Sequence, residues 1–385
     1  MKRVLFLTKR RYPDGDASSK RDCIFAKYFI DRGYEVVFIG MGRTPYKKVE
    51  SIDGVSMVSL KRYKNPNFIQ KILNHLFVEK KIVNYGIQHY GDSDIIFSEP
   101  NLFKTLRKRI KSFKTQNIIY SSVEFYSPSE YPLNGLFSSG YHKNIFFNTK
   151  IKPSDGKVIA ISNYLKNHFA NMNMKVVAIP FVINNKDNKL DVSIANSEKR
   201  RFIYCGNPRK KDLLCDILIA FTKLPDALLS KCEVDVIGID NKWLLKQKIS
   251  KDLKNKILTF SSFKGSLPFS RIIETYKSYD YSLLLRPFEA RYAKAGFPTK
   301  ISESLEYGVP PVTNFTSDLG LYLKNEINCI EVHGDTSDAF KDALVLAISK
   351  TIEEIRDMKI NAKKTAVEKL DIKNFYKEMD EIVNN

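Results

Sequence analysis

The sequence predicts two successive doubly wound α/β domains, and three observations support this fold class. Short apolar runs, typical of buried parallel strands, alternate with segments whose apolar residues recur at helical spacing. A polar stretch, residues 185–200, divides the alternation into two series and is predicted to be a linker. The length of 385 residues suits two domains of fewer than about 200 residues each.

The first domain, residues 1–184, opens with a predicted βαβ unit. The apolar run Arg3–Thr8 is a strand, and a loop rich in Pro, Gly, Asp and Ser follows it. Helical spacing over Asp22–Arg32 ends at Gly33, a helix-terminating glycine, before the strand Glu35–Gly40. Four more strands complete this domain: 94–97, 117–120, 157–161 and 176–180.

The second domain, residues 201–365, repeats the alternation, starting with a strand at 202–206 that ends in glycine. Its later strands are predicted at 234–238, 257–260, 281–285 and 309–313. Its helices are predicted at 213–222, 271–279 and 299–307, and most of 335–383 is helical by pattern. The final segment, residues 366–385, is expected to be a helix that packs back on the first domain.

Composition excludes several classes of protein. Hydrophobic residues make up 43%, which argues against a disordered chain, and no apolar run approaches the roughly 20 residues that span a bilayer. The apolar run after Met1 stops at Thr8, before Lys9, so no signal peptide is predicted and the protein is expected to be cytoplasmic. The five cysteines are scattered, and neither they nor the histidines show metal-ligand spacing, so no metal or other cofactor is expected.

The formal net charge of +20 is unevenly distributed. Residues 1–184 carry 30 Lys and Arg against 14 Asp and Glu, a net charge of +16, and the remainder carries +4. A strongly basic half implies an acidic partner, which leaves nucleic acid, anionic lipid and a phosphorylated substrate open.

The segment from Gly296 to Val312 has the features of an anion site. Gly296 and Pro298 shape a turn, and Thr299 is predicted to cap the helix that follows. A helix N-terminus favours phosphate, and Lys300 adds a full positive charge there. Glu303, one turn further on, is placed to accept hydrogen bonds from hydroxyl groups. The alternative is an amphipathic helix with a solvated charged face.

This segment resembles the donor site of GT-B glycosyltransferases, especially glycosyltransferase family 4. The matching positions are Gly296, Phe297, Pro298, Glu303, Gly308, Pro310 and Val312. The family pattern has two glutamates; Glu303 matches the second, and Ala295 stands at the first. The resemblance implies a GT-B fold, two Rossmann-like domains facing a cleft. It also implies that Glu303 binds the donor ribose and that Lys300 lies near the donor phosphates.

A second matching segment runs from Tyr204 to Leu214. The family form places an arginine and a lysine on the donor diphosphate; Lys211 matches the lysine, and Arg209 stands two residues beyond the arginine position, which Asn207 occupies. Without the resemblance, a basic surface loop is the simpler interpretation. By the same resemblance, Gly265 is expected to meet the nucleobase, and either Arg286 or Arg291 is expected to reach phosphate.

The first domain is expected to present the acceptor. Gly15 lies in the loop after the first strand, where the backbone is predicted to approach the reacting centre. Glu124 follows a strand at its carboxyl end, where α/β proteins place their sites, and is a candidate general base. A glutamate exposed on the surface is the equal alternative.

A basic, apolar stretch suggests contact with anionic membrane. Apolar residues recur over 68–83 among lysines, and Lys104–Lys114 holds six basic residues. The alternative is a core-packed helix with a solvated charged face.

Together these features predict a hexosyl-type, retaining glycosyltransferase of bacterial surface polysaccharide synthesis. Its expected partners are a nucleotide-diphosphate sugar and a glycan or lipid-linked glycan acceptor, at the inner face of the cell membrane and without nucleic acid. Two alternatives remain open at this point: a nucleotide-sugar 2-epimerase of the same fold, and a non-enzymatic basic protein that binds nucleic acid.

Overall fold

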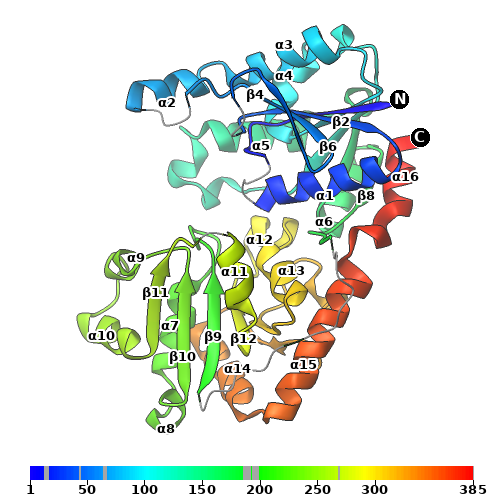
Figure 1. The fold of residues 1–385 in the computed structure, drawn as a ribbon. Helices are drawn as coiled ribbons and strands as arrows, with labels where there is room; N and C mark the ends of the chain where they lie inside the picture. Colours follow the sequence, from blue (N-terminus) through cyan, green and yellow to red (C-terminus); the bar gives the residue numbers. More distant parts are fainter. Residues whose placement is uncertain are drawn as a thin grey trace. The chain divides into compact units, whose positions relative to one another are not determined.

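The computed structural model describes residues 1–12, 17–42, 45–63, 67–184, 192, 199–267 and 269–384. The chain divides into two compact units: residues 1–184 with 372–385, and residues 185–371. Each unit is built on one sheet, of eight strands in the first and six in the second (Figure 1). Most of the segment 185–200, predicted to be a linker, lies outside the described residues.

The sheet of the first unit has the strand order β3-β4-β2-β1-β5-β6-β7-β8. Its neighbours pair in parallel, except for the antiparallel pair β3 and β4. Sequence analysis missed this hairpin, whose turn places Asp53 and Gly54 at positive φ. The strands are β1 (Arg3–Leu7), β2 (Glu35–Gly40), β3 (Val49–Ile52), β4 (Val55–Ser59), β5 (Ile95–Ser98), β6 (Ile118–Ser122), β7 (Lys157–Ala160) and β8 (Val176–Ala178).

Helices cover both faces of this sheet. One face carries α1 and α16, since Phe29 and Met379 share a core cluster with Phe6 of β1. On the other face α3 approaches closely: a Cβ added at Gly86 would lie 3.1 Å from the Leu7 side chain. The helices are α1 (Ala17–Asp31), α2 (Phe68–His75), α3 (Val78–Tyr90), α4 (Phe103–Arg107), α5 (Ser139–Lys150), α6 (Asn163–Ala170) and α16 (Tyr376–Asn384).

The C-terminal helix α16 is part of the first unit and lies beside β8 (Figure 1). Its Asp380 carboxylate accepts hydrogen bonds from the Tyr28 hydroxyl, at 2.6 Å, and from the Arg32 guanidinium, at 3.1 Å to Nε. Ile382 and Val383 are buried in the same core. The last residues of the chain therefore complete the sheet covering begun by α1.

The sheet of the second unit is parallel throughout, in the order β11-β10-β9-β12-β13-β14. Its strands are β9 (Arg200–Cys205), β10 (Cys232–Ile237), β11 (Ser261–Gly265), β12 (Tyr281–Leu284), β13 (Pro311–Thr313) and β14 (Ile330–Glu331). Its helices are α7 (Leu214–Thr222), α8 (Asp226–Leu229), α9 (Asn241–Leu245), α10 (Lys251–Phe260), α11 (Phe269–Tyr276), α12 (Arg291–Ala295), α13 (Thr299–Glu306), α14 (Ser337–Ser349) and α15 (Ile352–Thr365).

The core of the second unit also lies on both sides of its sheet. Phe202 and Tyr204 of β9 pack with α7, α10 and α14, whereas Ile203, between them, packs with Tyr276 of α11. Short 3₁₀ or π helices fill other connections in the chain: η1 (Pro100–Leu102), η2 (Ile110–Ser112), η3 (Pro128–Glu130), η4 (Pro132–Gly135), η5 (Pro153–Asp155), η6 (Leu319–Leu321), η7 (Ala366–Leu370) and η8 (Ile372–Phe375).

The prediction of two doubly wound α/β units is confirmed, but one predicted strand is wrong. Residues 257–260 form the last turn of α10, and the strand β11 begins one residue later, at Ser261. The Ser250 side chain caps this helix by accepting a hydrogen bond from the Leu253 amide. Ile257 and Phe260, three positions apart, form its buried face. A four-residue apolar run fits a strand and a buried helix turn equally well, and here the helix prevails.

Candidate functional site

Three glycines stand where neighbouring strands of the second unit end. Gly206 follows β9, Gly238 follows β10 and Gly265 ends β11, with φ of 125°, 104° and 66° respectively. Their loops are closely packed, because a Cβ at Gly238 would lie 2.8 Å from the Gly206 backbone. A Cβ at Gly206 would lie 2.8 Å from Cε of Lys300. The side chain of Lys300 therefore lies directly on the backbone at the end of β9.

A buried carboxylate holds Lys300 in this position. Lys300 Nζ lies 2.8 Å from one oxygen of Asp212, and Arg286 Nε lies 2.9 Å from the other. The Tyr204 hydroxyl donates a third hydrogen bond to this carboxylate, at 2.8 Å. These residues come from α13, from the loops after β12 and β9, and from β9 itself. Asp212 thus gathers two cations at the carboxyl edge of the sheet.

The charge of this cluster follows from the pKa of Asp212. Burial alone raises the pKa of the carboxyl, but the charges of Lys300 and Arg286 and the hydrogen bonds from Lys300 and Tyr204 outweigh it and hold the pKa at about 2. The carboxylate is therefore ionised at neutral pH. Two cations around one anion leave one net positive charge, which suits a phosphate group.

The other predicted donor cations lie on neighbouring segments. Tyr292 of α12 donates its hydroxyl to the backbone oxygens of Lys210 and Lys211, each at 3.1 Å, and so ties α12 to the loop after β9. Arg291 is the first residue of α12 and is half-buried. Arg209 is exposed, at φ 47°, and its amide donates to the Asn207 side chain. The structure brings Lys211 and Arg291 to adjacent segments, while Arg209 extends into solvent.

The prediction that Thr299 caps α13 is wrong. Pro298 is the N-cap residue, with extended ψ of 112° and no side-chain cap, and Thr299 is the first helical residue. Because proline fixes its own φ, it can set the start of the helix without a capping hydroxyl. Thr299 remains half-buried beside Lys300.

Glu303 is half-buried on the second turn of α13. Burial is the larger cause of the raised pKa values of Tyr276 and Tyr307, and the Glu303 charge contributes to both. Those two rings lie 5.4 Å apart. Ala295, at the position of the missing family glutamate, is fully buried.

Gly265 borders a pocket of about 390 Å³ beside the ends of β10 and β11. Gly238, Asp240 and Trp243 also line it. The Gly265 amide donates to the Ile239 oxygen at 3.1 Å, and its oxygen accepts from Gly238 at 2.7 Å. Gly265 is thus held by backbone hydrogen bonds at the rim of a cavity in the second unit.

In the first unit, Glu124 lies two residues beyond the end of β6 and is half-buried. Its side chain accepts a hydrogen bond from the Tyr126 hydroxyl at 2.5 Å, and its backbone oxygen accepts from Asn144 at 2.8 Å. The carboxylate is therefore oriented at the carboxyl edge of this sheet. Gly15, predicted to approach the reacting centre, lies outside the described residues.

Sequence analysis missed a buried ionic group at the same edge. Glu99 directly follows β5, accepts the Lys9 amide at 2.9 Å and pairs with Arg10 at 3.4 Å; its side chain is 3% exposed. Arg10 also contacts Asp22 of α1 at 3.4 Å. The sequence signal for this group was a glutamate directly after a buried strand, but Glu99 belongs to no recognised motif. The role of Asp212 was missed for the same reason.

Comparison with known proteins places the second unit in a family. The family model of glycosyl transferases group 1 matches residues 185–365, which is nearly all of this unit. The second unit is therefore similar to a glycosyl transferases group 1 domain over nearly its whole length. No curated protein sequence matches the chain.

Solved structures show the fold of the whole chain. Sucrose-phosphate synthase from Thermosynechococcus elongatus is 11% identical, with a TM-score of 0.75 over 100% of this chain and 98% of that one. WaaG, a glycosyltransferase involved in lipopolysaccharide biosynthesis, is 14% identical, with a TM-score of 0.68 over 99% and 100%. HepE from Anabaena, in complex with UDP and glucose, is 12% identical, with a TM-score of 0.68 over 100% of both chains. The α/β sheets of the two units therefore match those of GT-B glycosyltransferase structures.

Two further findings concern the part of the chain that the structure describes. Within it, no three His, Cys, Asp or Glu side chains gather as a metal site would require. No helix there is long and apolar enough to cross a bilayer.

Proposed function

We propose that this chain is a nucleotide-sugar-dependent glycosyltransferase. In this proposal it transfers a hexose to a glycan or lipid-linked glycan acceptor in bacterial surface polysaccharide synthesis. The observation that carries the proposal is the cluster of Asp212, Lys300 and Arg286. Lys300 lies in the first turn of α13, and Glu303 lies in the next turn of the same helix. Such a cluster offers charge for a diphosphate and a carboxylate for ribose hydroxyls.

The chemistry assigned to these groups is leaving-group stabilisation. The bond between the anomeric carbon and the diphosphate oxygen breaks, the acceptor oxygen bonds to that carbon, and the nucleoside diphosphate departs with the electron pair. Lys300 and Arg286 stabilise the negative charge that develops on it, so we propose transfer without a metal. We propose retention of configuration and assign Glu124 to receive the proton of the acceptor hydroxyl.

A uridine diphosphate sugar is the first donor to test. The solved complexes of Anabaena HepE contain UDP and glucose in one case and UDP-glucose in another. Following the donor by NMR without any acceptor separates transfer from 2-epimerisation, since only an epimerase would convert it.

Glu303→Ala is expected to weaken UDP binding about 10- to 100-fold, because a carboxylate that accepts hydroxyl hydrogen bonds contributes about 1–3 kcal/mol. Isothermal titration calorimetry with UDP measures this directly. The matched control is Glu289→Ala, since the Glu289 side chain is 92% exposed and pairs with Lys294 on the surface. If UDP, GDP and ADP all fail to bind the wild-type protein, the proposed function is wrong.

We also propose that α2 contacts anionic membrane. Phe68, Ile69 and Ile72 are 77%, 67% and 51% exposed, whereas Ile82 and Val83 of α3 are fully buried. The core-packed alternative therefore holds for α3 but not for α2. An exposed apolar stripe in a unit with a large excess of positive charge matches the chemistry of an anionic lipid surface, on the inner face of the membrane.

The double variant Phe68→Asp, Ile72→Asp is expected to lower binding to phosphatidylglycerol vesicles at least tenfold, because each buried side chain contributes about 1.5–3 kcal/mol. Co-sedimentation measures the bound fraction. Leu245→Asp, which changes a residue 59% exposed on α9, serves as the matched control. Equal binding of wild type and double variant would remove α2 from the proposed contact.

A further inference from the structure

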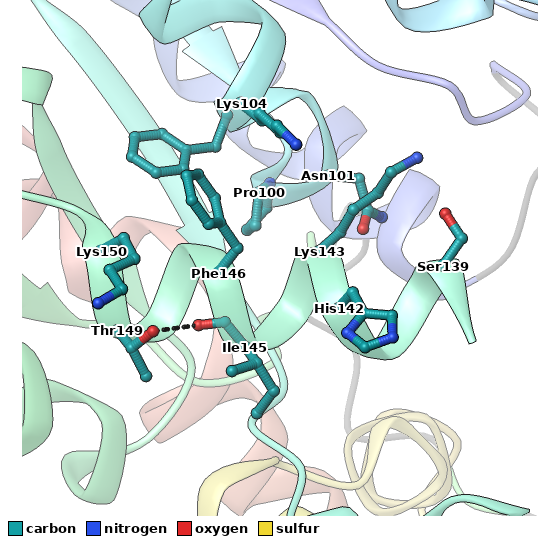
Figure 2. A pocket seen from close by; sticks show the side chains of 11 residues that line it. Pro100, Asn101, Lys104, Ser139, His142, Lys143, Ile145, Phe146, Thr149 and Lys150 are labelled. Carbon is teal, nitrogen blue, oxygen red and sulfur yellow. Dashed lines mark hydrogen bonds between the residues drawn. The ribbon is translucent and has the colours of Figure 1, made fainter. Parts of the chain in front are cut away.

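A groove in the first unit lies between α5 and the segment formed by η1 and α4 (Figure 2). Its volume is about 540 Å³, within the range of small-ligand sites of about 300–1,000 Å³. The α5 residues that line it recur at helical spacing: Ser139, His142, Lys143, Phe146 and Lys150. One face of α5 therefore forms a wall of this groove.

The middle of the groove is apolar. The rings of Phe103 and Phe146, one from each wall, lie 5.7 Å apart, and Ile145 adds an aliphatic side chain. Just before α5 in the sequence, Leu136 and Phe137 are 64% and 83% exposed. A hydrocarbon chain in the groove would cover apolar surface that now faces water.

The charged groups of the groove are all cationic. Lys104, Lys143 and Lys150 line it, and none of its described lining residues is acidic. The exposed Lys104 ammonium lies 5.8 Å from the centre of the Phe146 ring. Figure 2 shows Lys104 and Lys143 on the side of Pro100 and Asn101, with Lys150 at the other end.

The Asn101 end of the groove begins at the carboxyl edge of the sheet. Pro100 and Asn101 follow Glu99, the residue directly after β5. Lys143 pairs with Glu79 of α3, and Glu79 also contacts Lys9, which follows β1, at 3.1 Å. Ligands of open α/β sheets bind outside this edge. The end of the groove that holds Lys104 and Lys143 thus lies where the first unit should hold the reacting part of a substrate.

We propose that this groove binds a lipid phosphate, and that the acceptor is therefore carried on a single hydrocarbon chain. The phosphate lies beside Lys104, Lys143 and the Asn101 amide, and the chain lies against Phe103 and Phe146. This inference rests on the proposed function and names its acceptor class. Two lysines at the end beside Asn101 and two aromatic rings in the middle of the groove fit one chain with one anionic head. A bilayer surface would need an open face such as α2.

The test uses the full chain and geranyl phosphate, a short soluble lipid phosphate, titrated by calorimetry. We expect saturable binding at one site, with geraniol and inorganic phosphate each at least tenfold weaker, since each lacks one half of the ligand. Lys104→Glu and Phe146→Ser are each expected to lower the affinity for geranyl phosphate at least tenfold. Lys108→Glu, an exposed site next to α4 that does not line the groove, should bind as wild type.

Urea unfolding of the same variants reports whether the first unit is folded, and their UDP binding keeps the two proposals separate. Loss of geranyl phosphate binding with UDP binding intact is the expected result for Lys104→Glu. Unchanged affinity in both groove variants, or no binding by the wild type while UDP binds, overturns the inference and leaves the proposed function standing. If the wild type binds geranyl phosphate but not UDP, the groove is a lipid-phosphate site and the proposed function is wrong. If the two variants weaken only binding to phosphatidylglycerol vesicles, the groove serves a bilayer and the inference is wrong.

Discussion

Lys300→Ala is expected to lower kcat/KM for the sugar donor about 10²- to 10³-fold, the usual loss when one preorganised donor to a developing oxyanion is removed. Lys300 Nζ is held 2.8 Å from Asp212 and lies against the backbone of Gly206, so it is fixed before substrate arrives. Initial rates with UDP-glucose as the donor, or with whichever nucleotide sugar binds, give the ratio.

The variant should remain folded, because Asp212 keeps Arg286 and the Tyr204 hydroxyl as partners. Lys294→Ala is the matched control: this lysine pairs with exposed Glu289 on the same stretch of chain and should show near wild-type rates. A Lys300→Ala enzyme with wild-type kcat/KM would mean that Lys300 is only a structural partner of Asp212.

Asp212→Ala is expected to reduce the free energy of unfolding by about 3–5 kcal/mol, since removing one partner of a buried ion pair leaves the others buried without compensation. The Asp212 side chain is 1% exposed, and Arg286, at 11%, would keep its charge beside an apolar gap. Urea unfolding measures the change. Asp342→Ala, at an exposed site on α14, should leave the midpoint unchanged.

The ionised Asp212 carboxylate and its cationic partners also predict that the stability of the fold depends on pH. Because the folded-state pKa of Asp212 lies near 2, below its unfolded value of about 3.9, its stabilisation is fully present above about pH 4 and is lost as pH falls towards 2. Over that window the pair should contribute about 2–3 kcal/mol, and Asp212→Asn should remove this part of the acid sensitivity. Identical acid unfolding profiles for wild type and Asp212→Asn would contradict this assignment.

The fold was largely predictable because buried parallel strands are continuous apolar runs, as in β1 and β2, and the helices between them have a distinct period. Two elements were not predicted correctly. The hairpin β3–β4 has an exposed first strand with no apolar pattern, so nothing in its composition marked it. Residues 257–260 were misassigned because their burial pattern is shared by strands and helix turns.

The sequence by itself determined the local parts of the proposed donor site: the turn at Gly296 and Pro298, and a helix that places Lys300 and Glu303 on successive turns. These follow from backbone preferences over a few residues. Only the tertiary structure decided that Asp212 pairs with Lys300 and Arg286, which lie 88 and 74 residues later in the sequence. It likewise paired Phe103 with Phe146 in the groove of the first unit. Local patterns report which side chains are buried, but partners so distant in sequence are set by strand order and by the packing of helices on the sheet.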